Sequence, residues 1–317
     1  MEFEQLETAA FWRELMPDLA VQPDHDQPVT VLTPNETTSN AMLRILDREG
    51  YVQLPRSQDV EHMAKLARLV EAVRALGLPP VFSFIYDEMW QPYRRLGPVI
   101  DCLLRGRHAM MPHLWAWYID PGKGEAGWTP HCDRPGRAVY ADLRPKAITI
   151  WIPLTEATTL NGCMYLIPKH RDNCYGQIDK ENFNLDLADI RALPAVPGDS
   201  LIWTQDVTHW GSRTSEMAKG PRLSMSVEFQ RRDEPPLSNF VIRPDQGMTF
   251  ERKLALIGHA IVNYQHMHRL DGDLVTAARR WRGRIPALFG LGAIRLGDPS
   301  PPAHHLAQDL PSHHEPT

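Results

Sequence analysis

The sequence predicts a mainly β domain with helices on both sides. Between residues 110 and 232, short apolar runs are separated by Gly, Pro, Asn and Asp, which is typical of strands and turns. Amphipathic helical patterns precede this stretch and return after it. The 317 residues are enough for one large core. We therefore expect a single domain over residues 1–298, with its β core at about 110–232, helical flanks over 1–109 and 233–298, and a disordered tail over 299–317.

The N-terminal flank contains a predicted helix–strand unit and a longer helix. The stretch "SNAMLRILDREGYVQLP" (39–55) predicts a capped helix that ends at Gly50, followed by a strand at Tyr51–Leu54. Residues 60–76 give the clearest amphipathic helix. Its apolar face is expected to carry Val60, Met63, Ala67, Val70 and Val73.

The central stretch contains five predicted strands. They are "HLWAWYID" (113–120), "KAITIWIPL" (146–154), "CMYLIP" (163–168), "DSLIWTQD" (199–206) and "RLSMSVEFQ" (222–230). The last strand alternates strictly, so successive side chains point to opposite faces. One face carries Leu223, Met225, Val227 and Phe229, and the other carries Arg222, Ser224, Ser226 and Glu228. Helical periodicity then returns near 251–270.

Composition and charge narrow the function classes. The net charge is −5, which gives no attraction to nucleic acid or to an anionic membrane. No apolar run approaches the length of a membrane span, and the acidic start lacks the basic region of a signal peptide. The four cysteines include no CxxC pair. We expect a cytoplasmic protein with a small-molecule substrate, and the oligomeric state is left open.

A histidine and an aspartate lie two residues apart in "GWTPHCDRPG" (127–136). In an extended strand, residues i and i+2 project from the same face, so His131 and Asp133 would point to one place and Cys132 away from it. A further histidine, His209, follows the strand "SLIW" 78 residues later. Two histidines and one carboxylate bind one face of iron(II) and leave its other positions open for oxygen chemistry.

A basic residue follows on the polar face of the last strand. Arg222 comes 13 residues after His209, and Ser224 lies on the same face. A guanidinium suits a two-pronged grip on a carboxylate, and a nearby hydroxyl adds a hydrogen bond. This pair is expected to hold the distal carboxylate of 2-oxoglutarate, while the keto-acid end of that co-substrate binds the iron.

Three blocks resemble the phytanoyl-CoA dioxygenase-like family of iron(II)- and 2-oxoglutarate-dependent oxygenases. "LDREGYVQLP" (46–55) is similar to its N-terminal helix-to-strand signature, and "ITIWIPLTEATTLNGCMYLIPKH" (148–170) to its strand, "NG" and "PGSH" block. "VPGDSLIWTQDVTHWGS" (196–212) is similar to the turn that leads to its distal histidine. "PKH" replaces "PGSH" here, and residues 80–130 and those after 232 match no family block.

The resemblance implies a double-stranded β-helix, a jelly-roll or cupin-like barrel buttressed by helices. It places the iron ligands at His131, Asp133 and His209 and the co-substrate arginine at Arg222. Trp151 is expected beside 2-oxoglutarate, and Ser212 or Ser224 to supply the hydroxyl. Related halogenases carry a small residue where this chain has Asp133, so hydroxylation is favoured over halogenation.

The implied function is hydroxylation of a C–H bond of a small organic metabolite by iron(II), 2-oxoglutarate and O₂, with decarboxylation of 2-oxoglutarate to succinate. Desaturation and cyclisation stay open as outcomes, and the substrate is not identified. Arg134, Arg137 and Lys123 hint at an anionic group on it. Two alternatives remain: a metal-binding barrel without turnover, and a cupin-type metalloenzyme that does not use 2-oxoglutarate.

Two other motifs compete with these assignments. "HRD" at 170–172 is a second His-x-Asp pair, but it follows Pro168 in a predicted turn, and its His170 lies only 39 residues before His209. It is therefore the less favoured ligand pair. "GKGEAG" (122–127) fits a dinucleotide-binding glycine pattern, but Pro130 and the lack of a helical apolar period after it favour a loop.

Overall fold

Two antiparallel sheets form the centre of the protein. The computed structural model describes residues 3–21, 28–178, 186–244, 246–268, 270–292 and 296. The five-stranded sheet has the order β1 (Tyr51–Leu54), β6 (Ser200–Thr204), β3 (Ala147–Pro153), β8 (Arg222–Arg231) and β2 (His108–Ile119). The three-stranded sheet has the order β5 (Arg191–Leu193), β4 (Met164–Leu166) and β7 (His209–Gly211). This is the double-stranded β-helix that the resemblance implied, and the fold prediction is confirmed.

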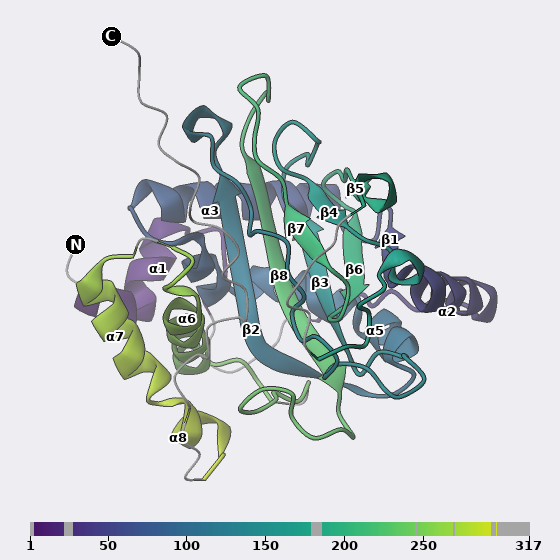
Figure 1. Cartoon of the computed structure of the whole chain (residues 1–317). Helices are drawn as coiled ribbons and strands as arrows, with labels where there is room; N and C mark the ends of the chain where they lie inside the picture. Colours follow the sequence, from purple (N-terminus) through teal and green to yellow (C-terminus); the bar gives the residue numbers. More distant parts are fainter. Residues whose placement is uncertain are drawn as a thin grey trace.

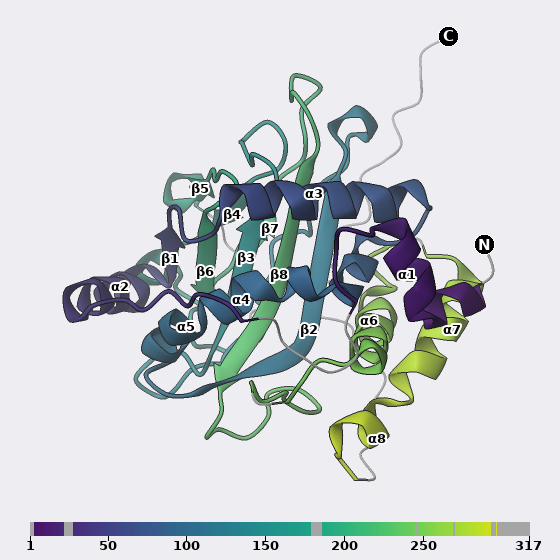
Figure 2. The same cartoon turned by 180° about the vertical axis from the view of Figure 1, so that it is seen from behind.

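Helices cover one face and the edges of the large sheet (Figure 1). They are α1 (Ala9–Leu15), α2 (Glu36–Glu49), α3 (Val60–Ala75), α4 (Gln91–Arg95), α5 (Gly97–Leu104), α6 (Phe250–Tyr264), α7 (Gly272–Arg282) and α8 (Ile285–Phe289). Seen from behind, α3 crosses over the strands, with α4 and α5 below it (Figure 2). Helices α6 and α7 lie beyond β2, and α2 lies at the β1 end. The face of the large sheet that these helices leave free turns toward the small sheet.

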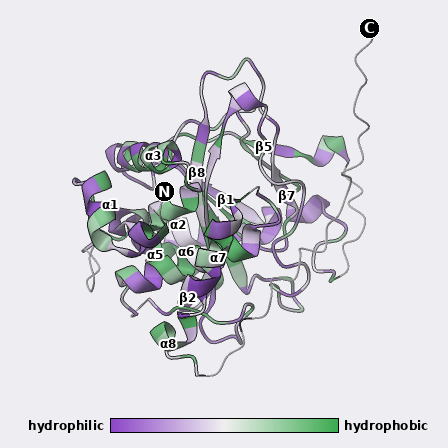
Figure 3. Cartoon of the chain, turned by 90° about the vertical axis from the view of Figure 1, so that its left-hand side faces the viewer, coloured by the Kyte–Doolittle hydropathy of each residue, from purple (hydrophilic) through white to green (hydrophobic). Residues whose placement is uncertain are grey.

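The N-terminal elements begin and end for local reasons. The Asn35 side chain accepts a hydrogen bond of 2.8 Å from the Thr38 backbone N–H at the start of α2. Gly50 ends that helix with a φ of 78°, a conformation that glycine adopts without strain. Along α3, polar and apolar residues are interleaved (Figure 3), but the expected apolar face is wrong at one end. Val60 is 57% exposed, because it is the first helical residue and precedes the buried turns.

Apolar and polar side chains alternate along β8 as predicted, but both faces of this strand are buried. Leu223, Met225 and Val227 pack into the core between sheet and helices. The polar residues on the opposite face are equally inaccessible, with Arg222 only 1% exposed. This polar face lies inside the barrel, between the two sheets, which positions it for a site.

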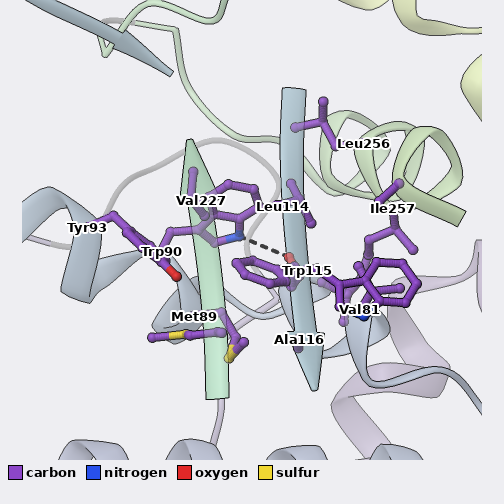
Figure 4. Close-up of a cluster of buried hydrophobic side chains, with 14 of the residues drawn as sticks. Val81, Met89, Trp90, Tyr93, Leu114, Trp115, Ala116, Val227, Leu256 and Ile257 are labelled. Atoms are coloured by element: carbon purple, nitrogen blue, oxygen red, sulfur yellow. Dashed lines mark hydrogen bonds between the residues drawn. The ribbon is translucent and has the colours of Figure 1, made fainter. Parts of the chain in front are cut away.

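The core on the helical side connects the flanks to the sheet. Figure 4 shows Val227 of β8 and Leu114 of β2 in one cluster with Leu256 and Ile257 of α6. In the same cluster the Trp90 indole N–H donates a hydrogen bond of 2.9 Å to the Phe84 carbonyl. The β core is wider than expected, because β1 pairs with β6 and so belongs to the large sheet although it precedes residue 110. The predicted tail over 299–317 lies outside the described residues.

Among the helices that the structure describes, none combines the length and the apolar character needed to cross a bilayer.

A buried histidine on α6 gives a testable pH dependence of stability. His259 is 2% exposed, and burial, aided by the charge of Arg282, lowers its pKa to about 3. In the unfolded chain its pKa is about 6.5, so below that pH the unfolded state binds a proton that the folded state does not. When the pH falls from 7 to 5.5, this histidine should lower the free energy of unfolding of the wild type by ~1 kcal/mol. The His259→Gln variant should not show this loss. Urea denaturation of both proteins at the two pH values measures this, and equal losses would contradict it.

Candidate metal centre

The backbone brings two distant histidines side by side. The segment that precedes His131 runs antiparallel to β7, with bridges between Ala126 and Arg213 and between His131 and His209. The His131 N–H donates to the His209 carbonyl at 3.1 Å, and the His209 N–H donates to the His131 carbonyl at 2.9 Å. His131 is thus a single bridge residue followed by a bend at Asp133, so the expected regular strand is wrong. The two side chains nonetheless point to the same place.

Two glycines allow this close approach. A side chain added at Gly127 would lie 2.6 Å from the Cα atom of Gly211, which is closer than real contacts allow. A side chain at Gly211 would lie 2.8 Å from the Gly127 Cα and 3.2 Å from the Arg222 guanidinium. Gly127 is the last glycine of the "GKGEAG" stretch, and the residues directly after that stretch form no helix. Gly127 therefore allows its backbone to contact that of Gly211 beside the two histidines.

Three side chains converge on one point. Asp133 Oδ1 lies 3.6 Å from His131 Nε2 and 3.6 Å from His209 Nε2. All three donor atoms lie within 4.8 Å of one another, and among the described residues this is the group of histidine, cysteine and acidic side chains that could hold a metal ion.

Hydrogen bonds outside this group fix its orientation. His131 Nδ1 lies 2.7 Å from the Thr129 carbonyl and His209 Nδ1 lies 3.0 Å from the Val207 carbonyl. A carbonyl only accepts, so each Nδ1 carries the proton and each Nε2 keeps its lone pair for a metal. On the carboxylate, Asp133 Oδ2 accepts from the Thr149 hydroxyl at 2.6 Å and from the Trp203 indole at 3.4 Å. These bonds leave Oδ1 turned toward the histidines.

The electrostatics of the group fit a divalent cation. Burial lowers the pKa of His209 to about 4, which keeps its imidazole neutral. Burial also opposes the ionised form of Asp133, but the neighbouring imidazoles outweigh it and hold the Asp133 pKa below its usual range. For His131, the hydrogen bond and charge of Asp133 outweigh burial and raise the pKa. A partly buried carboxylate between two imidazole nitrogens is a donor set that iron(II) accepts.

Thr149 gives a prediction about metal affinity. Thr149→Val removes the hydroxyl that orients Asp133 and keeps the volume of the side chain, so metal affinity should fall by about 10- to 100-fold. Calorimetric titration with Mn(II) measures the effect without turnover. Thr149→Ser keeps the hydroxyl and serves as the matched control. Equal affinities for the wild type and Thr149→Val would show that the hydroxyl does not orient the carboxylate.

A buried arginine lies in the same cavity. Arg222 and Trp151 line it together with the three candidate ligands. The Arg222 guanidinium carbon is 5.7 Å from the centre of the Trp151 ring, and its Nη1 donates to Ser224 Oγ at 2.6 Å. Burial lowers the pKa of Arg222 to about 10, so the group is charged at neutral pH.

This charge has no counter-ion within the described chain, where no carboxylate lies at ion-pair distance from Arg222. Its Nε and the Trp151 Nε1 are both buried without a hydrogen-bond partner among the described residues. A buried cation and orphaned donors are costly unless an anion completes them. The arrangement therefore suits the carboxylate of a bound co-substrate. Ser224 is the hydroxyl that contacts Arg222, whereas Ser212 lies after β7 with its own Oγ buried and unpartnered in the described structure.

The second His-x-Asp pair lies elsewhere. His170 is exposed, and its Nδ1 lies 3.3 Å from the Arg48 carbonyl. Asp172 accepts a hydrogen bond of 3.1 Å from the Thr208 hydroxyl. Neither residue lines the cavity that contains Asp133.

Sequence reasoning missed several residues of the site. Thr149 and Trp203 hold the carboxylate, and His113, Glu228 and Tyr264 line the cavity. Glu228 shares the face of β8 with Arg222, so strand alternation was a usable signal for it. Tyr264 lies at the end of α6, and no local pattern connects it to the cavity.

The chain is similar to one protein family and to several solved structures. A family model described as phytanoyl-CoA dioxygenase (PhyH) matches residues 48–219, which is more than half of the chain. Among solved structures, EctD from S. alaskensis with 2-oxoglutarate and 5-hydroxyectoine is 20% identical, with a TM-score of 0.47 over 68% of this chain and 84% of that one. The α-ketoglutarate-dependent epimerase SnoN from nogalamycin biosynthesis is 16% identical, with a TM-score of 0.48 over 62% and 84%. A search of curated proteins found no match.

Proposed function

The chain belongs to the phytanoyl-CoA dioxygenase family of iron(II)- and 2-oxoglutarate-dependent oxygenases, and we propose that it hydroxylates a C–H bond of a small organic metabolite. In this proposal His131, Asp133 and His209 hold the iron, and Arg222 with Ser224 holds the distal carboxylate of 2-oxoglutarate. Trp151 forms a wall beside the co-substrate. The reaction would convert 2-oxoglutarate to succinate and CO₂ and place one oxygen atom of O₂ on the substrate.

One observation carries the proposal. The three donor atoms meet within 4.8 Å in a cavity that also contains a buried, charged arginine without a counter-ion in the described chain. A barrel that only binds metal gives no reason for that arginine, and a cupin-type enzyme that works without 2-oxoglutarate would need a different anion to complete it. Within the described residues Arg222 donates to the Ser224 hydroxyl and not to that of Ser212, so Ser224 is the better candidate for the hydroxyl.

The residues of the chain have distinct tasks. Bound iron(II) would supply the activation of O₂. The two backbone carbonyls keep the imidazole nitrogens turned inward, and Thr149 keeps the carboxylate in place. Arg222 orients the co-substrate by fixing its far end. The buried aromatic walls keep water from the reacting groups.

Substrate screening tests the proposed reaction. The purified protein with Fe(II), ascorbate and 2-oxoglutarate should form succinate, and a substrate should stimulate this turnover. Mass spectrometry in ¹⁸O₂ should then show one labelled oxygen atom in the product. A product without the label indicates desaturation, cyclisation or epimerisation, and the absence of succinate under all conditions supports a non-catalytic barrel.

Domain organisation and location follow as secondary proposals. One continuous hydrophobic core draws on residues from Leu6 to Phe289, which supports a single domain over residues 1–298. None of the four cysteines forms a disulfide in the described structure, in keeping with a cytoplasmic protein.

A further inference from the structure

The part of the cavity away from Arg222 contains polar groups that the protein leaves without partners. Ser226 and Glu228 extend from β8, His113 from β2 and Tyr264 from α6, and all four line the cavity. The described chain provides no hydrogen bond to the Ser226 hydroxyl, the Tyr264 hydroxyl or the ring nitrogens of His113. Ser226 is buried and His113 and Tyr264 are partly buried. Polar groups in such places are normally paired, so these unpaired groups are available to a ligand.

Glu228 is paired on one oxygen only. Its Oε2 accepts from the Arg134 guanidinium and, at 2.9 Å, from the Gln205 amide. Within the described residues Oε1 accepts no hydrogen bond. Glu228 therefore offers one fixed acceptor to the cavity, held in place by two donors on its other oxygen.

Arg134 is not available to bind an anion. Besides Glu228, its guanidinium donates to the Gln205 side-chain oxygen at 3.0 Å and to the Leu237 carbonyl at 3.4 Å. The hint of an anionic substrate, which the basic residues gave at the sequence level, is thus not supported at Arg134. With Glu228 ionised, the Arg134–Glu228 pair is neutral as a unit, and burial keeps His113 uncharged by lowering its pKa well below the usual value. This side of the cavity carries no uncompensated charge from these groups.

The walls around these polar groups are aromatic. Trp128 lies with its ring centroid 4.8 Å from that of Tyr264 and 5.5 Å from that of Trp117. The Trp128 indole N–H is buried without an acceptor in the described chain. Aromatic walls with a few aimed polar groups are typical of sites for small, largely apolar ligands.

We propose that this region is the substrate subsite and that it takes an uncharged, hydroxyl-bearing molecule with an apolar ring or chain, whose hydroxyl donates to Glu228 Oε1. This inference rests on the proposed function, because it assigns the substrate class to the same cavity. A cationic group on the ligand would be repelled by the Arg134 charge behind Glu228. An anionic group would be repelled by the Glu228 carboxylate itself.

Four probes that share a phenyl ring test the assignment: 2-phenylethanol, its methyl ether, 2-phenylethylamine and phenylacetate. Their affinities are measured by ligand-observed NMR on the full chain loaded with Ni(II) and 2-oxoglutarate, which prevents turnover. Burial raises the pKa of Glu228 to about 7, so the titrations are made at pH 8, where the carboxylate is ionised. The alcohol should bind about 10-fold more tightly than its ether, because only the alcohol donates a hydrogen bond to a charged acceptor.

Glu228→Gln provides the matched variant. Arg134 and Gln205 both donate to one oxygen, so the amide oxygen must take that position and the NH₂ group replaces Oε1. In this variant the ratio of the affinity for the alcohol to that for the ether should fall to about one or below. The reason is that the group facing the ligand changes from a hydrogen-bond acceptor to a donor. An unchanged preference would overturn the inference, as would tighter binding of the amine or of phenylacetate than of the alcohol.

Binding of 2-oxoglutarate to the same samples separates the two proposals. If 2-oxoglutarate does not bind to the Ni(II) protein, the proposed function fails. The ratio of the affinities for the alcohol and the ether, measured on the metal-loaded protein, still shows whether the subsite binds a hydroxyl group as proposed. If 2-oxoglutarate binds and the alcohol shows no preference over the ether, only the subsite inference fails.

Discussion

Asp133→Ala is expected to reduce iron-dependent succinate formation to background. Asp133 supplies the single anionic donor between His131 and His209, with its Oδ1 3.6 Å from each Nε2. Without it, two neutral imidazoles remain, and these bind a divalent ion far more weakly than the full set. Metal content after gel filtration and the rate of succinate formation measure the two consequences separately.

A matched control distinguishes this loss from a general effect of removing an acid. Asp142 is an exposed aspartate nine residues later that pairs with Arg144 on the surface. Asp142→Ala should therefore leave metal content and turnover unchanged. Near-normal turnover by Asp133→Ala, with iron occupancy confirmed, would show that the ligand assignment is wrong.

Much of the site could be predicted because its signals are local. The spacing of His131 and Asp133 predicted side chains on one side of the chain, and their donor atoms do lie 3.6 Å apart although no regular strand forms there. On β8, strand alternation alone puts Arg222, Ser224 and Glu228 on one face. Such patterns depend only on backbone geometry over a few residues, so they survive whatever the rest of the fold does.

The remaining features depend on which segments pair. The approach of Gly127 to Gly211 and the bridge of His131 to His209 join segments about 80 residues apart. Thr149 of β3 is paired with Trp203 of β6, and both side chains donate to Asp133, so this contact depends on a long-range strand pairing. The exposure of Val60 was mispredicted for a similar reason, since helical periodicity identifies a face but not where along the helix the neighbouring sheet begins.

Arg222→Ala is expected to raise the Michaelis constant for 2-oxoglutarate by about 100-fold or more, because it removes a buried, charged partner of the carboxylate. Metal affinity should stay near that of the wild type, since the bonds that orient the ligands come from Thr149 and from two backbone carbonyls. Steady-state kinetics at saturating Fe(II), together with Mn(II) titration, separate these effects.

Two further variants show whether the geometry or only the charge of Arg222 matters. Arg222→Lys keeps a positive charge but loses the planar fork that grips a carboxylate on two sides, so its Michaelis constant should lie between those of the wild type and the alanine variant. Arg144→Ala removes an exposed arginine and should change nothing. An unchanged Michaelis constant in Arg222→Ala, with normal turnover, would mean that the buried guanidinium does not bind 2-oxoglutarate. The orphaned donors of Arg222 and Trp151 would then have to be completed by a different anion, and a cupin-type enzyme without this co-substrate would become the better explanation of the same metal group.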